Sequence, residues 1–208
     1  MTKVHPNISA ESRTPPPSVA AAIGVGEVET PPEVLTVWKK SLLFNCNGFT
    51  VFDAKGNLVF RVDNYVSDNR GEIVLMDSSG KPLLTFRRKK LSLGDHWVVY
   101  NGEEHSNPLF SVKKHVTFLN SKSLAHVTPC GGGAARGFFI EGSYTQRSCS
   151  VYDDSRRQVA EIRRKETTAG GVRFGVDVFR LVVRPGIDVT VAMAVVILLE
   201  QMFGSRKG

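Results

Sequence analysis

The sequence predicts a mainly β protein: a closed antiparallel barrel of about twelve strands that encloses one hydrophobic C-terminal helix. Three observations lead to this fold class. Short alternating apolar strands recur from Leu35 onward, polar turns separate them, and the last long segment, Gly186 to Gly204, is apolar on every side. Closing such a sheet removes its edges, and an apolar helix can fill the lumen that closure creates.

Residues 1–34 precede this region and are rich in proline and small residues. The segment contains Pro15-Pro16-Pro17 and Pro31-Pro32 and has no aromatic residue. This composition cannot bury enough apolar surface to offset the entropy of the chain, so we expect a disordered tail. A Pro-rich tail is also a natural contact for a protein partner. Residues 35–208 are expected to form a single barrel domain.

Four segments share one plan, in which a strand runs into a polar turn that starts with Asp or Asn, and a second strand ends in basic residues. These hairpins are Phe49–Asp63, Ile73–Lys89, Trp97–Lys114 and Cys149–Lys165. Further strands are predicted at Leu35–Lys39, His115–Asn120, Leu124–Thr128, Gly137–Thr145, Gly171–Phe179 and Arg180–Arg184. The last two of these can be read as one continuous strand.

The repeated Asp at the start of each turn is explained by turn chemistry. Its carboxylate can accept from the backbone N–H two residues on, and Gly56 and Gly80 supply the positive φ that follows. No second acid is spaced for a calcium cage, and the histidines have no zinc-site spacing. We therefore predict no metal site and no cofactor.

The final apolar segment predicts a helix at about residues 188–203. Pro185 and Gly186 break the preceding segment, Asp188 can serve as the N-cap, and Gly204 suits the C′ position. About fifteen residues span roughly 22 Å at 1.5 Å per residue. A membrane span needs about twenty apolar residues, so we expect a buried core helix instead of a transmembrane one.

The predicted domain is basic. The chain carries 27 Lys and Arg against 20 Asp and Glu, for a net charge of +7, and its N-terminal tail is slightly acidic. A basic domain favours an anionic partner, either a phospholipid surface or nucleic acid. Nucleic acid is the less favoured of the two, because the sequence offers no recognition helix to enter a groove.

Basic residues end the second strand of three hairpins, so they are expected near one rim or face of the barrel. The candidate lipid-headgroup residues are Arg87, Arg88, Lys89, Lys90, Lys113, Lys114, Arg163, Arg164 and Lys165. Neighbours along a strand point to opposite faces, so at most half of each cluster can act together. The alternative is that these charges only protect strand ends from aggregation.

Motifs of enzymes are missing from the sequence. GxSxG, GxxxxGK[ST] and HExxH are absent, and Gly131-Gly132-Gly133 reads as a linker. We predict no catalytic residue. Cys46, Cys130 and Cys149 are odd in number and widely spaced, and the chain starts without a secretory signal. We expect reduced thiols and a cytoplasmic protein, with peripheral plasma-membrane or nuclear locations left open.

The hairpin texture, the Trp38-Lys39 start and the segment VDVFRLVVRPGIDVTVAMAVVILLEQMF resemble the plant LURP-one-related family. That family is similar to tubby C-terminal domains and phospholipid scramblases. The resemblance implies a twelve-stranded barrel around a central helix over about Val34 to Phe203, and a role in plants that includes basal pathogen defence. Only Asp177 and Asp188 remain of the acidic segment that precedes the scramblase helix, so calcium control is not expected.

Tubby domains bind phosphoinositides through Lys and Arg on the barrel exterior, although no single residue can be carried over by position. We expect a monomeric, non-catalytic module that docks on anionic phospholipid headgroups, phosphoinositides included, and that acts as a membrane-tethered regulator in plant defence signalling. An alternative is a protein-interaction scaffold that uses the Pro-rich tail and binds no lipid. A phospholipid scramblase would need the C-terminal helix to span a bilayer.

Overall fold

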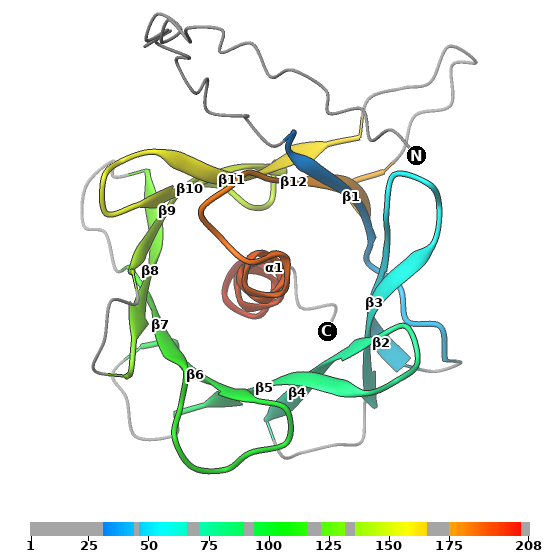
Figure 1. Ribbon diagram of the computed structural model, residues 1–208, viewed down its shortest axis with the longest axis horizontal. Helices are drawn as coiled ribbons and strands as arrows, with labels where there is room; N and C mark the ends of the chain where they lie inside the picture. Colours follow the sequence, from blue (N-terminus) through cyan, green and yellow to red (C-terminus); the bar gives the residue numbers. More distant parts are fainter. Residues whose placement is uncertain are drawn as a thin grey trace, which may run out of the picture.

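Twelve antiparallel strands form one closed barrel around a single helix (Figure 1). The computed structural model describes residues 31–43, 46–65, 71–89, 94–115, 122–131, 136–165 and 175–204. The strands are β1 (Glu33–Trp38), β2 (Cys46–Phe52), β3 (Leu58–Tyr65), β4 (Glu72–Asp77), β5 (Pro82–Arg88), β6 (His96–Asn101), β7 (Phe110–Lys114), β8 (Ser123–Pro129), β9 (Phe138–Ser143), β10 (Ser148–Asp153), β11 (Gln158–Arg164) and β12 (Val178–Val183). The helix is α1 (Val189–Phe203).

Each strand pairs with its neighbours along the chain, and β1 pairs with β12 to close the ring. Across this seam Leu35 lies opposite Leu181, and Val37 lies opposite Phe179. All four side chains are fully buried. Closure gives every described strand a partner on both sides, and the predicted closed barrel is confirmed.

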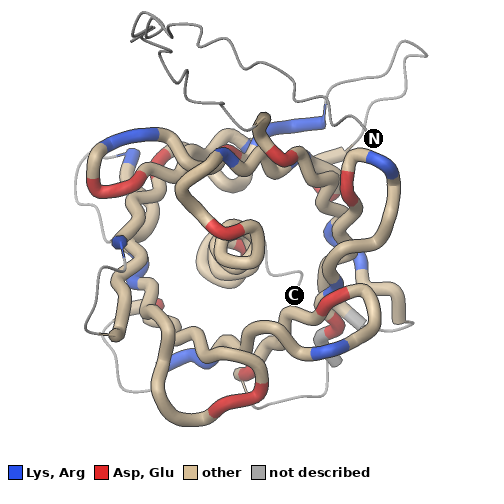
Figure 2. The backbone as a smooth tube through the Cα atoms, in the orientation of Figure 1, with Lys and Arg blue, Asp and Glu red and all other residues tan. Residues whose placement is uncertain are grey.

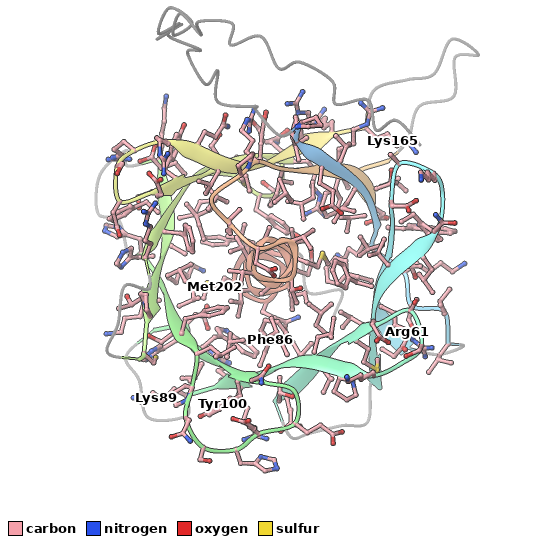
Figure 3. The ribbon with its side chains drawn as sticks, viewed as in Figure 1. Arg61, Phe86, Lys89, Tyr100, Lys165 and Met202 are labelled. Carbon is pink, nitrogen blue, oxygen red and sulfur yellow. The ribbon has the colours of Figure 1, made fainter. Side chains whose placement is uncertain are left out.

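The core lies between the inner face of the barrel and α1. Inward-facing residues alternate along the strands, and the helix residues from Ala192 to Leu199 are all buried. Figure 3 shows Phe86 and Met202 inside the ring, whereas Tyr100 lies on its outside. A helix that is apolar on every side is buried on every side because the barrel surrounds it. The enclosed helix predicted from the sequence is confirmed.

Both helix ends have specific caps. Asp188 Oδ1 accepts from the backbone N–H groups of Thr190 (2.8 Å) and Val191 (3.3 Å), so the predicted N-cap is confirmed. Gly204 follows the last helical residue, but its φ is −63°, which is not the left-handed conformation typical of a C′ glycine. Glycine is required there because a Cβ would collide with the backbone and side chain of Glu200.

The turns after β2 and β4 are Asx-turns, as predicted. Asp53 Oδ1 accepts from the backbone N–H of Lys55 at 2.8 Å, and Asp77 Oδ1 accepts from that of Ser79 at 2.9 Å. Gly56 and Gly80 follow with φ of +86° and +92°. A side-chain hydrogen bond from Asn57 holds the pKa of Asp53 below its usual value.

The turn after β10 repeats this design without a glycine. Asp153 Oδ1 accepts from the backbone N–H groups of Ser155 and Arg157, both at 2.9 Å. Arg156 takes the positive-φ position with φ of +62°. The carboxylate hydrogen bonds hold this residue in a conformation that a non-glycine residue rarely adopts.

Three predicted boundaries need correction. β1 begins at Glu33, inside the predicted tail of residues 1–34, because Glu33 and Val34 pair with β12; residues 1–30 lie outside the described residues. The predicted strand Gly171–Phe179 is wrong over residues 175–177, which form a turn, but its last two residues begin β12, and this strand runs on to Val183 as the continuous alternative predicts. His115 follows β7, and the rest of the predicted strand His115–Asn120 lies outside the described residues.

The antiparallel order divides the loops between two ends of the barrel. We call the end at which α1 begins the amino rim; it carries the turns after the even-numbered strands β2, β4, β6 and β10. We call the end at which α1 ends the carboxyl rim; every odd-numbered strand ends there. Figure 2 shows both acidic and basic residues in the amino-rim loops, which surround the start of α1.

Candidate anion-binding site at the carboxyl rim

The topology places the three predicted basic clusters at one end of the barrel. β5, β7 and β11 all end at the carboxyl rim, so Arg87–Lys89, Lys113–Lys114 and Arg163–Lys165 lie there together. Only β6 separates the first two clusters, whereas the third lies on another arc, beside β12. Lys90 lies outside the described residues.

In each cluster one residue occupies a strand position from which side chains point toward the lumen. Its side chain forms an ion pair or a hydrogen bond at the mouth of the barrel. Arg88 Nη2 lies 2.6 Å from Asp95 Oδ1. Lys114 Nζ donates to the carbonyl oxygen of Met202 at 2.9 Å, near the end of α1. Arg164 Nη2 donates to Gln146 Oε1 at 2.6 Å. These three side chains have structural partners.

The neighbouring residues in each cluster point outward. Arg87 forms an ion pair with Glu72 at 2.8 Å, and Arg163 forms one with Glu161 at 2.7 Å. Both carboxylates partly neutralise the outer surface at these points. Lys165 lies on the outside of the ring in Figure 3. Neighbouring residues alternate in direction within each cluster, although two of the three residues in Arg163–Lys165 face outward.

Lys89 and Lys113 are different, because their ammonium groups form no ion pair or hydrogen bond within the described part of the chain. Both are exposed, and both flank His96 on neighbouring strands. The Lys89 backbone N–H donates to the His96 carbonyl at 2.9 Å, and His96 lies directly opposite Lys113 in the β6–β7 ladder. The three residues form a row across the outer face, which we call the basic row (Lys89, His96, Lys113).

His96 is buried, with an exposed fraction of 9%, although its strand position faces outward. Its Nε2 atom has no hydrogen-bond partner among the described residues. Burial lowers the pKa of this imidazole, and the positive charges of Lys113 and Lys89 lower it further. A neutral, desolvated imidazole between two cations is an arrangement that an anion would stabilise.

The next residue across the sheet, His126, contacts Thr128 and Phe139. It lies opposite Lys113 on β8, and its Nδ1 lies 3.2 Å from Thr128 Oγ1. Its ring stacks on Phe139 at a centroid distance of 4.5 Å. The basic row therefore ends at Lys113.

The carboxyl rim also exposes large apolar side chains. Trp38 is 42% exposed, Leu42 and Leu43 follow in the β1–β2 connection, and Val176 precedes β12. These are four of the five large apolar side chains that are exposed in the described ranges. Lys40 Nζ lies 5.3 Å from the centre of the Trp38 ring. Apolar and cationic groups therefore share this end of the barrel.

The mouth of the barrel at the carboxyl rim is closed by charged groups around Glu200. Lys39 Nζ lies 2.6 Å from Glu200 Oε1, and Arg147 Nη2 lies 3.8 Å from Oε2. The Arg147 guanidinium lies over the rings of Tyr144 and Phe179, at 4.2 and 4.3 Å. Cations near the last turn of a helix also stabilise its carbonyl end.

At the amino rim an apolar cavity of about 470 Å³ lies between the first turn of α1 and the ends of β7, β8 and β9. Its lining residues are Leu109, Phe110, Val127, Pro129, Arg136, Phe138, Gly186 and Val191. Arg136 alone among these is charged. Sequence reasoning did not find this cavity, the basic row or the Arg147 contacts, because each one depends on residues from separate strands.

These features define a class of protein: a closed twelve-stranded barrel threaded by its C-terminal helix, with a basic and apolar rim at the helix end. A family model described as LURP-one-related matches residues 33–200. The chain belongs to the LURP-one-related family, as the resemblance in the sequence predicts.

Two relatives from Arabidopsis thaliana match nearly the whole chain. LURP-one-related 8 is 51% identical over 99% of this chain and 100% of its own length. LURP-one-related 17 is 42% identical over 96% and 95%. An X-ray structure of another Arabidopsis thaliana protein superposes with a TM-score of 0.58 at 28% identity, covering 82% of this chain and 91% of that one. None of the described residues forms a helix long and apolar enough to cross a membrane.

Proposed function

We propose that this chain is a non-catalytic module that docks on membranes rich in anionic phospholipids, including phosphoinositides, through its carboxyl rim. The single observation that carries this function is the convergence of three basic strand ends on one rim. Each Lys or Arg close to an anionic leaflet contributes about 1 kcal/mol to binding. Lys40, Lys89 and Lys113 have no ion pair within the described part of the chain, so their charges remain available.

The exposed apolar residues support the same orientation. Peripheral proteins combine electrostatic attraction to anionic lipid with burial of apolar side chains in the headgroup region. Trp38 is suited to that region, because its ring is apolar and its indole N–H can remain hydrated. The defence-signalling role implied by the family would then act from a membrane surface.

Helix α1 supports docking over lipid translocation. Its central residues are buried against the barrel, so a bilayer span would require the barrel to open and its core to be exposed. The protein-interaction scaffold remains the competing function, with its contact in the tail of residues 1–34, which lies almost entirely outside the described residues.

The test is co-sedimentation of the full chain with liposomes of phosphatidylcholine alone, or with phosphatidylserine or phosphatidylinositol bisphosphate, at low and physiological salt. We expect binding only to the anionic liposomes. The triple variant Lys40→Gln, Lys89→Gln, Lys113→Gln should lose about 3 kcal/mol, roughly a hundredfold in affinity.

The matched control removes three exposed cations from the opposite end: Lys55→Gln, Lys81→Gln and Arg136→Gln. It changes the net charge by the same amount, so general charge attraction would weaken both variants equally. Docking through the carboxyl rim predicts nearly unchanged binding for the control. Failure of the wild-type chain to sediment with any liposome would refute docking, and capture of a protein partner by residues 1–34 would then support the scaffold.

A further inference from the structure

The basic row contains a buried histidine, which plays no part in a general electrostatic attraction between lysines and an anionic membrane. His96 lies between Lys89 and Lys113 on the outer face of the sheet, and its Nε2 atom is buried without a hydrogen-bond partner in the described structure. A buried polar nitrogen without a partner is destabilising, and in folded proteins such groups are nearly always paired with protein, water or ligand. Nε2 has almost no accessible surface, so an acceptor between the two lysines would satisfy it after displacing the groups that now cover this atom.

The two charged residues that flank His96 in the row are both cationic. Lys89 faces His96 from the end of β5, and Lys113 faces it from β7, with His126 beyond. The nearest acid in the chain, Asp95, is bound to Arg88 at 2.6 Å and to Lys114 at 3.7 Å, on the lumen side of the rim. No described carboxylate forms an ion pair with Lys89 or Lys113.

We propose that Lys89, His96 and Lys113 form a subsite for a phosphate monoester dianion on the outer face of β5, β6 and β7. Two ammonium groups match the two negative charges, and the imidazole N–H donates to a third oxygen. A phosphodiester or a carboxylate carries one charge and would leave one lysine unpaired. The same chemistry is offered by a phosphoinositide headgroup and by a soluble inositol phosphate.

Binding of a lipid headgroup at this subsite rests on the proposed membrane docking. Binding of a soluble phosphate monoester does not. A bound dianion would offset the positive charges of the two lysines, which now disfavour protonation of the ring. Binding should therefore be coupled to proton uptake by His96, and affinity should rise as pH falls from about 8 toward about 6.5, above the second pKa of the phosphate near 6.

The first experiment compares liposomes that contain phosphatidylinositol bisphosphate with phosphatidylserine liposomes of equal total charge, using the full chain. We expect the wild-type protein to prefer the bisphosphate by about tenfold or more. His96→Gln should abolish this preference while binding to phosphatidylserine stays unchanged. Lys55→Gln should leave the preference intact, and thermal unfolding of each variant verifies that it is folded.

The second experiment is calorimetric titration with soluble inositol 1,4,5-trisphosphate in two buffers of different ionisation enthalpy. The wild-type chain should take up a substantial fraction of a proton, with an upper limit of about one, and His96→Gln should take up none. Because this readout involves no membrane, it separates the subsite from docking. The Gln side chain of the variant can still donate one hydrogen bond, so some binding can remain. If His96→Gln binds the trisphosphate without proton uptake, His96 is the group that takes up the proton.

The outcomes are distinct. Sedimentation with both anionic liposomes without preference, together with no proton-linked trisphosphate binding, would overturn the subsite and leave rim docking in place. Proton-linked trisphosphate binding without sedimentation would support the subsite with a soluble inositol phosphate as its source and refute docking. A preference that persists in His96→Gln would overturn the assignment of His96.

Discussion

The two rims of the barrel are built in opposite ways. At the amino rim each Asx-turn closes within five residues, as Asp53 does with Asn57 and Asp77 with Lys81. At the carboxyl rim the contacts join distant parts of the chain, as when Lys39 reaches Glu200 and Lys114 reaches Met202. Local turns need only their own sequence, whereas the carboxyl rim forms only when the helix and the barrel are both in place.

The two rims also differ in the cavities and exposed side chains that they present. The amino rim contains an apolar cavity of about 470 Å³ beside the first turn of α1. The carboxyl rim is closed by charged groups, and outside it lie exposed apolar side chains and, within the described residues, three lysines without an ion pair, Lys40, Lys89 and Lys113. Self-contained turns can tolerate change singly, so we expect the carboxyl rim to be the more cooperative end of the barrel.

The largest expected difference is in thiol reactivity. Cys130 is exposed at the amino rim, whereas Cys149 is buried on β10 near the carboxyl rim, where desolvation raises the pKa of its thiol to about 12. Only the thiolate reacts, so a raised pKa means that at about pH 8 Cys149 should alkylate about a thousandfold more slowly than a thiol of ordinary pKa. Iodoacetamide labelling of a Cys46→Ser variant, read by mass spectrometry, measures both rates. Equal rates would show that β9 and β10 open readily.

Arg147→Met should cause the largest loss of stability. The change removes the guanidinium that contacts Tyr144, Phe179 and Glu200, and a buried ionic contact typically costs about 3 kcal/mol to break from one side. Chemical denaturation gives the change in the free energy of unfolding. Arg157→Met is the matched control, because this arginine is 64% exposed at the amino rim and should cost much less. Similar losses in both variants would contradict the difference between the rims.

A smaller effect is expected from Gly80→Ala. Gly80 has φ of +92°, which costs an L-residue about 1–2 kcal/mol, and no other atom lies near the added methyl group. Gly56→Ala should behave alike, and the two losses should add because each turn is closed by the carboxylate of its own aspartate. Gly175→Ala has open space and no positive φ, so it should be nearly neutral. Strong non-additivity in thermal unfolding would show that the amino rim is not a set of independent turns.

The smallest effects are expected at the two ends of α1. Asp188→Ala removes the N-cap and should cost about 1 kcal/mol. Lys114→Met removes a cation from the last carbonyls and should cost about 0.5 kcal/mol. Equilibrium unfolding of both single variants measures these values. A larger loss at Lys114 would mean that its contact with Asp95 also stabilises the rim.

The sequence was sufficient for features that depend on local pattern or strand direction. Asp53 and Gly56 specify their turn, Asp188 caps the helix, and alternating strand direction brings Arg87 and Arg163 to one rim. The basic row could not be predicted, since His96 meets Lys113 only through the register of β6 and β7. A shift of one residue would have turned the imidazole into the lumen.

Arg147 could not be predicted for a related reason. It sits in the turn between β9 and β10, where arginine usually indicates solvent exposure, yet it is only 5% exposed. Its partners come from β12 and from the end of α1, far along the chain. The start of β12 was also misplaced, because it is set by the pairing partner on β1 and not by its own apolar pattern.

The seam between β1 and β12 has a consequence for biosynthesis. During translation β1 is the first strand to be made, and its partner β12 is the last strand, followed by α1. Until β12 has been made, the growing chain holds an open sheet with two unprotected edges. The lumen also stays unfilled until α1 leaves the ribosome. Contacts of such long sequence separation form slowly, so the partly made barrel exposes its edges and its apolar inner face until β12 and α1 have been added.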